Sequence, residues 1–231
     1  SVNIDAAIIN EKTFNYGLTG KMVEECSIPV GNVVLEIIES KAGNDAALSA
    51  FVAKSREHGF LIALDDVGTG HSNLDRIPSL KPDIIKIDRS LITDINRKFH
   101  NMEVTRSLIS LAERTGSLPL AEGIETVEEA LTLMSLGIDV FQGYFFSKPA
   151  PAAMAINTDM APVKYLASRF KTHVLEKLNR QKIMENSYKR MAAKLRDALM
   201  NGTTGTLDSA LSAFITENTN IECAYILDTN G

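Results

Sequence analysis

The sequence predicts an α/β fold in which short parallel strands alternate with helices. Between residues 33 and 149, runs of consecutive apolar residues alternate with segments whose apolar residues recur at helical spacing. Strands that follow one another through helices pair in parallel by right-handed crossovers. Several of the runs end in a carboxylate or an amine, which is typical of a barrel whose rim carries a site. A closed barrel and an open doubly wound sheet both fit the alternation, and the recurring carboxylates favour the barrel.

The predicted strands are continuous apolar runs, the pattern expected of strands that are buried on both faces. They lie at residues 1–5, 33–38, 61–64, 84–87, 118–121 and 140–145. The helices between them have apolar residues three and four positions apart. They lie at residues 45–58, 102–114 and 127–136. Gly59, Gly116 and Gly137 follow the helices, at the place where a glycine commonly ends a helix.

The alternation of strand and helix patterns ends after Pro151. Residues 162–200 lack strand signals, and apolar residues recur in them at spacings of four and three, which predicts a long amphipathic helix. A short helix at 207–215 and a strand at 221–227 follow. We therefore expect an α/β domain, a helical connector and the start of an α+β domain, over residues 1–151, 152–205 and 206–231.

Composition and charge exclude several classes of protein. The 231 residues carry a net charge of −5, so the molecule as a whole has no basic field to attract DNA. No apolar run is long enough to span a membrane, and no signal peptide is visible. Cys26 and Cys223 fit no metal or disulfide spacing, which favours a reducing compartment. We therefore predict a cytoplasmic protein that binds no DNA and has no membrane segment in this chain.

Ionisable residues recur where the predicted strands end. They are Glu36, Asp65, Asp66, Lys86, Glu122 and Glu125. The adjacent carboxylates of Asp65 and Asp66 would repel each other and raise one pKa, and a divalent cation removes that penalty. Asn3, in the first apolar run, offers an amide oxygen that a hard cation also accepts.

Taken alone, each of these residues also has a purely structural explanation. The aspartates would lie in a solvated loop, and Glu36 would face solvent at a strand end. Lys86 would form an ion pair, and Glu125 would cap the following helix. Their recurrence at one end of successive strands favours a shared site.

Five segments, in this order, resemble the successive motifs of the EAL domain. They are Leu35-Glu36-Ile37-Ile38-Glu39-Ser40, Asp65-Asp66-Val67-Gly68-Thr69-Gly70, Lys86-Ile87-Asp88, Ala121-Glu122-Gly123-Ile124-Glu125 and Gln142-Gly143-Tyr144. The resemblance covers residues 1–151. It implies a TIM-like barrel that hydrolyses cyclic di-GMP to the linear dinucleotide pGpG with two Mg²⁺ or Mn²⁺ ions.

The resemblance also implies a role for each matching residue. The metal ligands would be Asn3, Glu36, Asp65, Asp66 and Glu122. Lys86 would hold or polarise the attacking water, Glu122 would act as general base as well as ligand, and Gln142 would contact the substrate. Glu125 would support the site without touching the metals. Glu39 would anchor the loop at 67–72, whose Gly68, Thr69 and Gly70 would couple dimerisation to metal binding.

The sequence departs from the family pattern at its start. The Glu-Ala-Leu tripeptide and the usual first strand are absent, and both would lie upstream of Ser1. We therefore expect a barrel without its first strands, in which the first metal lacks one carboxylate, and we expect this chain alone to be weakly active or inactive. The segment at 222–231 is similar to the opening of PAS-like or Cache-like sensor domains.

Two other functions fit the same motifs. A catalytically inactive EAL-like module would bind cyclic di-GMP as a receptor, and a purely structural unit would only mediate dimerisation. The retention of Glu36, Asp65, Asp66, Lys86 and Glu122 favours catalysis, because a receptor has no need of a full metal site. We expect a homodimer, since members of the family often dimerise near the loop at 67–72, here called the glycine loop.

Overall fold

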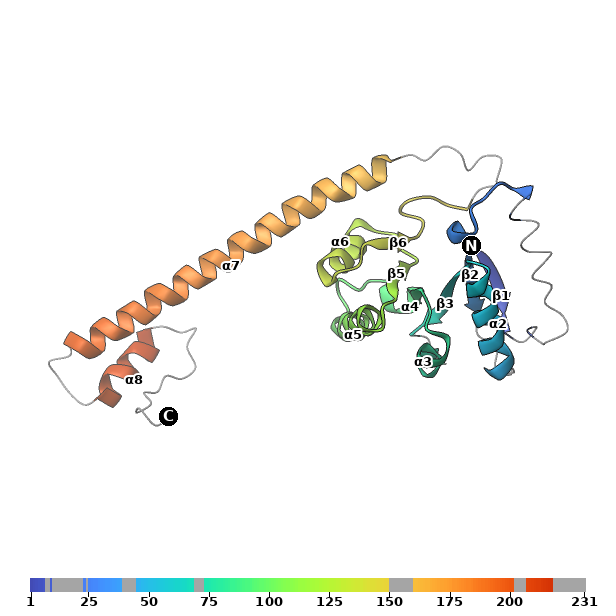
Figure 1. Cartoon of the computed structure of the whole chain (residues 1–231). Coiled ribbons are helices and arrows are strands. Elements are labelled where there is room, and N and C mark those ends of the chain that lie inside the picture. Colours follow the sequence, from blue (N-terminus) through green and yellow to red (C-terminus); the bar gives the residue numbers. More distant parts are fainter. Residues whose placement is uncertain are drawn as a thin grey trace. The chain divides into compact units, whose positions relative to one another are not determined.

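The structure is a computed structural model that describes most of the chain (Figure 1). The described residues are 1–6, 9, 23, 25–38, 45–68, 73–149, 160–201 and 207–217. The chain divides into two compact units, Ser1–Phe170 and Lys171–Gly231. The boundary between the units falls inside helix α7 (Ala161–Asn201), so this helix belongs in part to each.

The first unit is built on a parallel sheet of six strands whose spatial order is the order of the chain. The strands are β1 (Val2–Asp5), β2 (Val34–Ile38), β3 (Leu61–Val67), β4 (Ile84–Ile87), β5 (Leu118–Glu122) and β6 (Val140–Gln142). An open doubly wound sheet reverses its strand order at a switch point, and the described sheet contains no such reversal. The α/β prediction is confirmed, and the strand order fits the TIM-like alternative.

Three predicted helices connect the strands. They are α2 (Asp45–Glu57), α5 (Phe99–Thr115) and α6 (Val127–Leu136). The short elements were not predicted, because a single turn is too short to show a periodicity. These are η2 (Val30–Asn32), η3 (Asn73–Arg76), α3 (Ile77–Leu80) and α4 (Arg89–Ile92).

The predicted strand at 140–145 is too long, because β6 ends at Gln142. The following residue, Gly143, lies against the backbone of Ile124, so closely that a Cβ there would be 2.2 Å from the Ile124 oxygen. The chain turns at this contact, and the Phe145 N–H donates to the same oxygen at 3.0 Å. The strand therefore stops where its backbone turns to bond a neighbouring loop.

The core of the first unit lies between the sheet and its helices. Both faces of the central strands contribute buried residues, which explains the continuous apolar runs in the sequence. The largest fully buried strand residues are Leu35, Ile37, Ile62, Leu64, Ile85 and Ile87. The start of α7 belongs to this core as well, since Leu166 is 4% exposed and Phe170 packs against the cluster.

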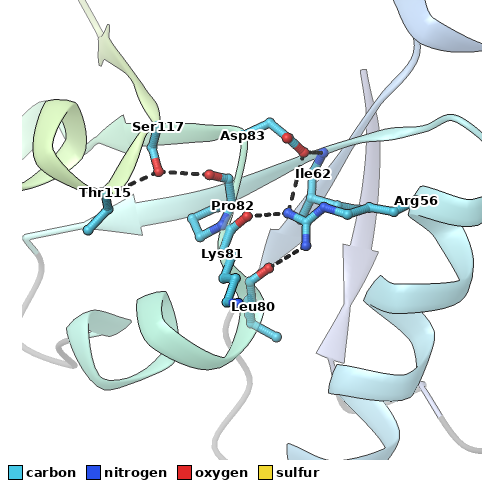
Figure 2. Close-up of polar contacts among 8 residues, drawn as sticks. All are labelled: Arg56, Ile62, Leu80, Lys81, Pro82, Asp83, Thr115 and Ser117. Carbon is cyan, nitrogen blue, oxygen red and sulfur yellow. Dashed lines mark hydrogen bonds and ion pairs between the residues drawn. The ribbon is translucent and has the colours of Figure 1, made fainter.

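A polar cluster closes the amino ends of β3, β4 and β5 (Figure 2). Asp83 accepts a hydrogen bond from the Ile62 N–H at 2.8 Å, and the Leu118 N–H donates to the Asp83 carbonyl at 2.8 Å. Arg56, from the end of α2, donates to the carbonyls of Leu80 and Lys81 and lies 3.5 Å from the Asp83 carboxylate. In α/β barrels this end of the strands serves stability, which leaves the carboxyl ends for a site.

The second unit contains the rest of α7 and the helix α8 (Leu207–Glu217). These two helices confirm the helices predicted at 162–200 and 207–215. In α8, Leu211 and Phe214 are buried. The predicted strand at 221–227, and with it most of the sensor-like segment at 206–231, lies outside the described residues. Among the helices of the described part, none combines the length and apolarity that crossing a membrane requires.

Candidate active site

The centre of the site is Lys86, whose ammonium contacts carboxylates from three other strands. Lys86 lies in β4 and is 4% exposed. Its Nζ is 2.8 Å from Glu36 Oε2 in β2, 2.8 Å from Asp65 Oδ1 in β3 and 2.5 Å from Glu122 Oε1 in β5. The structure therefore brings four of the predicted site residues into direct contact.

Burial and charge set the protonation of this cluster. Burial alone would lower the pKa of Lys86, but the hydrogen bonds that its ammonium donates to Asp65, Glu122 and Glu36 reverse this and raise its pKa well above the usual range. Burial is the largest effect on Glu122 and raises its pKa against the hydrogen bond and charge of Lys86, and the charges of Asp65 and Glu36 add smaller contributions in the same direction as burial. Burial alone would raise the pKa of Glu36. Its hydrogen bond to Lys86 is the largest of the effects that instead hold this pKa below the usual value. The resting cluster thus holds one ammonium among several carboxylates.

A β-bulge places Asp65 and Asp66 on the same side of the sheet. Leu64 pairs with Ile85 and Val67 pairs with Ile87, so β3 has one more residue than β4 in this interval. Asp66 takes up the extra residue with a positive φ of 54°. Adjacent strand residues normally point to opposite faces, and the bulge removes that alternation. We expected a turn at a strand end to do this, whereas β3 continues through Val67.

Asp65, Asp66 and Glu122 form a group that fits a divalent cation. Each offers one carboxylate oxygen, and these oxygens lie within 4.8 Å of one another. Burial raises the pKa of Asp66, and the charges of Asp65 and Asp88 raise it further against the pull of Lys86. A hard cation among these oxygens would relieve that repulsion.

The other predicted ligands lie on the neighbouring strands. Glu36 is not in the three-carboxylate group and is joined to it through Lys86. Asn3 in β1 pairs in register with Glu36, so its amide lies level with that carboxylate on the same side of the sheet. Asn3 is exposed, which leaves its oxygen accessible to a ligand.

A cavity of about 430 Å³ opens beside Glu122. It is lined by Arg89, Glu122, Gly123, Glu125, Gln142, Gly143, Tyr144, Ser147, Lys148 and Pro149. Gln142, the predicted substrate contact, pairs in register with Glu122 and faces solvent at this cavity. Glu125 forms an ion pair with Arg89, at 2.6 Å between Oε1 and Nη2.

The glycine loop is described only in part. Gly68 has a φ of +107°, and a Cβ there would lie 2.3 Å from Leu91 Cδ1, so this position requires glycine. Glu39, Thr69 and Gly70 lie outside the described residues. Their predicted roles in the loop therefore stay predictions.

Sequence reasoning missed several residues of the site. Arg89, Tyr144 and Lys148 line the cavity, and Glu129 fixes the loop between β5 and α6. For Arg89 a signal existed, because a third ionisable residue after Lys86 and Asp88 continues the pattern of charges at the strand end.

Glu129 is a buried carboxylate that holds two loops together. It is 4% exposed and accepts hydrogen bonds from the backbone N–H groups of Asp94, Glu125 and Thr126 at 2.9, 3.0 and 3.0 Å. The Thr126 side chain accepts from the Glu129 N–H, which completes a capping box at the start of α6. The loop that carries Glu125 is thereby tied to the loop that follows α4.

We expect Glu129→Gln to destabilise the protein at neutral pH. Burial alone would raise the pKa of Glu129, but the three N–H donors hold its pKa below the ordinary value of 4.5. A pKa lowered by folding gives stability that is present above about pH 4.5 and is lost as the pH falls through the folded value. The variant should lower the free energy of unfolding at pH 7 by about 1–3 kcal/mol.

Urea unfolding at several pH values measures this effect. The difference between Glu129→Gln and the unmodified protein should shrink as the pH falls below 4.5. Glu128→Gln, at the exposed neighbouring position in the same helical turn, is the matched control and should change the free energy of unfolding little. A difference that stays constant down to acid pH would contradict the role given to the charge of Glu129.

Comparisons with known proteins show the family of this chain. The family model described as the EAL domain matches residues 1–149. The probable cyclic di-GMP phosphodiesterase PdeA of Escherichia coli (strain K12) is 37% identical over 122 residues, which are 52% of this chain and 17% of that protein. The cyclic di-GMP phosphodiesterase PdeR of the same strain is 29% identical over 153 residues, 66% of this chain and 23% of that protein. The chain spans less than a quarter of the length of each of these two relatives.

Solved structures show the same likeness. The EAL domain of Mycobacterium smegmatis DcpA has a TM-score of 0.61 and 32% identity, over 65% of this chain and 68% of that chain. The Bacillus subtilis YkuI protein, in complex with substrate c-di-GMP and calcium, has a TM-score of 0.71 and 27% identity, over 93% of this chain and 55% of that one. A manganese and cy-diGMP complex of Klebsiella pneumoniae BlrP1 has a TM-score of 0.59 and 28% identity, over 64% of this chain and 38% of that one. With its family match over residues 1–149 and a parallel sheet like that of these structures, the chain belongs to the EAL domain family.

Proposed function

We propose that this chain provides the catalytic domain of a cytoplasmic, metal-dependent phosphodiesterase that hydrolyses cyclic di-GMP to linear pGpG. The observation that carries the proposal is the contact of Lys86 with Glu36, Asp65 and Glu122, next to the group that Asp65, Asp66 and Glu122 form. The names of the relatives support the substrate, since PdeA and PdeR are described as cyclic di-GMP phosphodiesterases.

The acidic residues would hold two divalent cations, Mg²⁺ or Mn²⁺. Asp65, Asp66 and Glu122 supply the carboxylates that lie close together, and Glu36 and Asn3 supply oxygens from the adjacent strands. When bound, such cations lower the pKa of a coordinated water and neutralise charge on the phosphoryl oxygens.

The protein's own residues would then position the water and move its proton. The Lys86 ammonium is fixed by three carboxylates, so it can hold the water beside the scissile phosphate without itself giving up a proton. The raised pKa of Glu122 brings this carboxylate closer to the pH at which it works, as suits a general base that accepts the proton of the water. Gln142, level with Glu122 on the next strand, would orient the substrate in the cavity.

The competing function is a receptor that binds cyclic di-GMP without cleaving it. The geometry favours catalysis, because Lys86 contacts three carboxylates from three different strands at once. A binding module needs contacts to the bases and phosphates, but it does not need an ammonium held among three carboxylates.

A turnover assay decides between the two. The intact protein is incubated with cyclic di-GMP and Mg²⁺ or Mn²⁺, and the nucleotides are separated by chromatography. We expect linear pGpG to form and EDTA to stop its formation. Binding of cyclic di-GMP without product would establish the receptor instead, and the absence of both binding and product would overturn the assignment of the substrate.

We also propose the arrangement of the protein around this domain. A connector at 152–205 would join the EAL domain at 1–151 to the start of a PAS-like or Cache-like regulatory domain at 206–231. The 41-residue helix α7 supports the connector, and the match to YkuI over 93% of this chain extends beyond the EAL domain. The homodimer that we expect would be seen as a doubled mass in sedimentation.

A further inference from the structure

Arg89 is held at the wall of the cavity by a glycine and a carboxylate. It is the first residue of α4, directly after β4 and Asp88. Its stem lies on Gly123, where a Cβ would be 2.5–2.8 Å from the Cβ, Cγ and Cδ of Arg89. Gly123 also has a φ of +71°, which disfavours any other residue. The guanidinium then meets the Glu125 carboxylate at 2.6 Å, so both ends of the side chain are fixed.

Another part of the cavity lining is attached to the same loop. The Ile124 N–H donates to the Gln142 carbonyl at 3.1 Å, and the Phe145 N–H donates to the Ile124 carbonyl at 3.0 Å. Tyr144 and Lys148 also line the cavity, with Lys148 Nζ 5.9 Å from the centre of the Tyr144 ring. The backbone on both sides of Gly143 is therefore bonded to the loop that carries Gly123 and Glu125.

Arg89 retains unused hydrogen-bond donors toward solvent. A guanidinium has five N–H groups, and Glu125 engages Nη2. The Arg89 side chain is 56% exposed although its stem and its Nη2 are held. A positioned fork of donors suits two neighbouring acceptors, and O6 and N7 of guanine are such a pair. Adenine has an amino group in place of O6, so it would place a hydrogen-bond donor against the N–H donors of Arg89.

We propose that Arg89 binds O6 and N7 of one guanine of the substrate, with Glu125 as the positioning residue for its guanidinium. This inference rests on the proposed function, because it places a base next to a phosphate that reacts at Glu122. Arg89 becomes a specificity-determining residue that selects guanine over adenine. A contact of Arg89 with a phosphate is the alternative, and it would discriminate no base.

Binding measurements with three dinucleotides test the proposal on the intact protein. Titration calorimetry gives Kd for cyclic di-GMP, for its 7-deazaguanine analogue, which lacks the N7 acceptor, and for cyclic di-AMP. Arg89→Ala and Arg89→Lys should each raise Kd for cyclic di-GMP about tenfold, because Lys cannot form the bidentate contact. The 7-deaza analogue should bind the unmodified protein several-fold more weakly than cyclic di-GMP, and the Arg89→Ala variant should bind the two equally.

Arg106→Ala is the matched control, because Arg106 is 56% exposed and pairs with Glu103 on α5 away from the lining of the cavity. It should leave every Kd unchanged. Glu125→Gln should raise Kd for cyclic di-GMP less than Arg89→Ala does. The guanine contact is wrong, while the proposed function stands, if Arg89→Lys has the same Kd for cyclic di-GMP as the unmodified protein. The same conclusion follows if the unmodified protein has the same Kd for the 7-deaza analogue as for cyclic di-GMP. If the unmodified protein binds no cyclic di-GMP, the proposed function fails as well.

Discussion

Replacing Lys86 with Met should abolish turnover and destabilise the metal-free protein. The Met side chain has a similar length, but it leaves Glu36, Asp65 and Glu122 facing one another without the ammonium that lies 2.5–2.8 Å from each. Removing one partner of a buried ion pair costs about 3–5 kcal/mol, because the remaining charge stays buried and unpaired. Urea unfolding in EDTA measures this loss, and the turnover assay measures the loss of activity.

A divalent cation should restore part of that stability. The carboxylates that lose Lys86 would accept Mn²⁺ in its place, so Mn²⁺ should raise the melting temperature of Lys86→Met more than that of the unmodified protein. Lys98→Met is the matched control, because Lys98 is half exposed and its nitrogen is 3.9 Å from Asp94. If Lys86→Met unfolds at the same urea concentration as the unmodified protein in EDTA, Lys86 is not the counter-ion of the cluster.

The sequence predicted the elements whose burial follows a simple period. Helix α6 was predicted with the bounds it has, because its apolar residues keep helical spacing and Gly137 ends it with a φ of 102°. The strands were predicted because both faces of the sheet are buried, which leaves continuous apolar runs. Strand β6 was predicted too long, because the contact of Gly143 with Ile124 has no local signal.

The candidate site was predictable where the residues lie at corresponding places on successive strands. Lys86 and Glu122 pointed to a shared site in this way, and they are in contact. The bulge at Asp66 was not predictable, because it depends on the pairing of β3 with β4. Glu129 was missed because it acts through the backbone of Asp94, in another loop, and Arg89 was missed although it continues the charges after Lys86, because its partner Glu125 is distant in the sequence.

Replacing Glu122 with Gln should remove turnover while binding of cyclic di-GMP persists. The amide keeps the shape of the side chain and an oxygen for Lys86, but it cannot accept the proton of the water. Loss of a general base lowers kcat about 10²–10⁴-fold. The assay for linear pGpG measures kcat and calorimetry measures Kd, which should change only a few-fold. Turnover within tenfold of the unmodified protein would remove Glu122 from the mechanism.

The comparison of Glu122 with Glu125 separates chemistry from substrate positioning within one short loop. Glu122 contacts Lys86 in the buried cluster, whereas Glu125 is 43% exposed and contacts Arg89 at the cavity wall. Glu122→Gln should therefore lower kcat with little change in KM, and Glu125→Gln should raise KM with little change in kcat. A fall in kcat of the same size in both variants would mean that the loop acts as a single unit, and that Glu122 has no separate part in proton transfer.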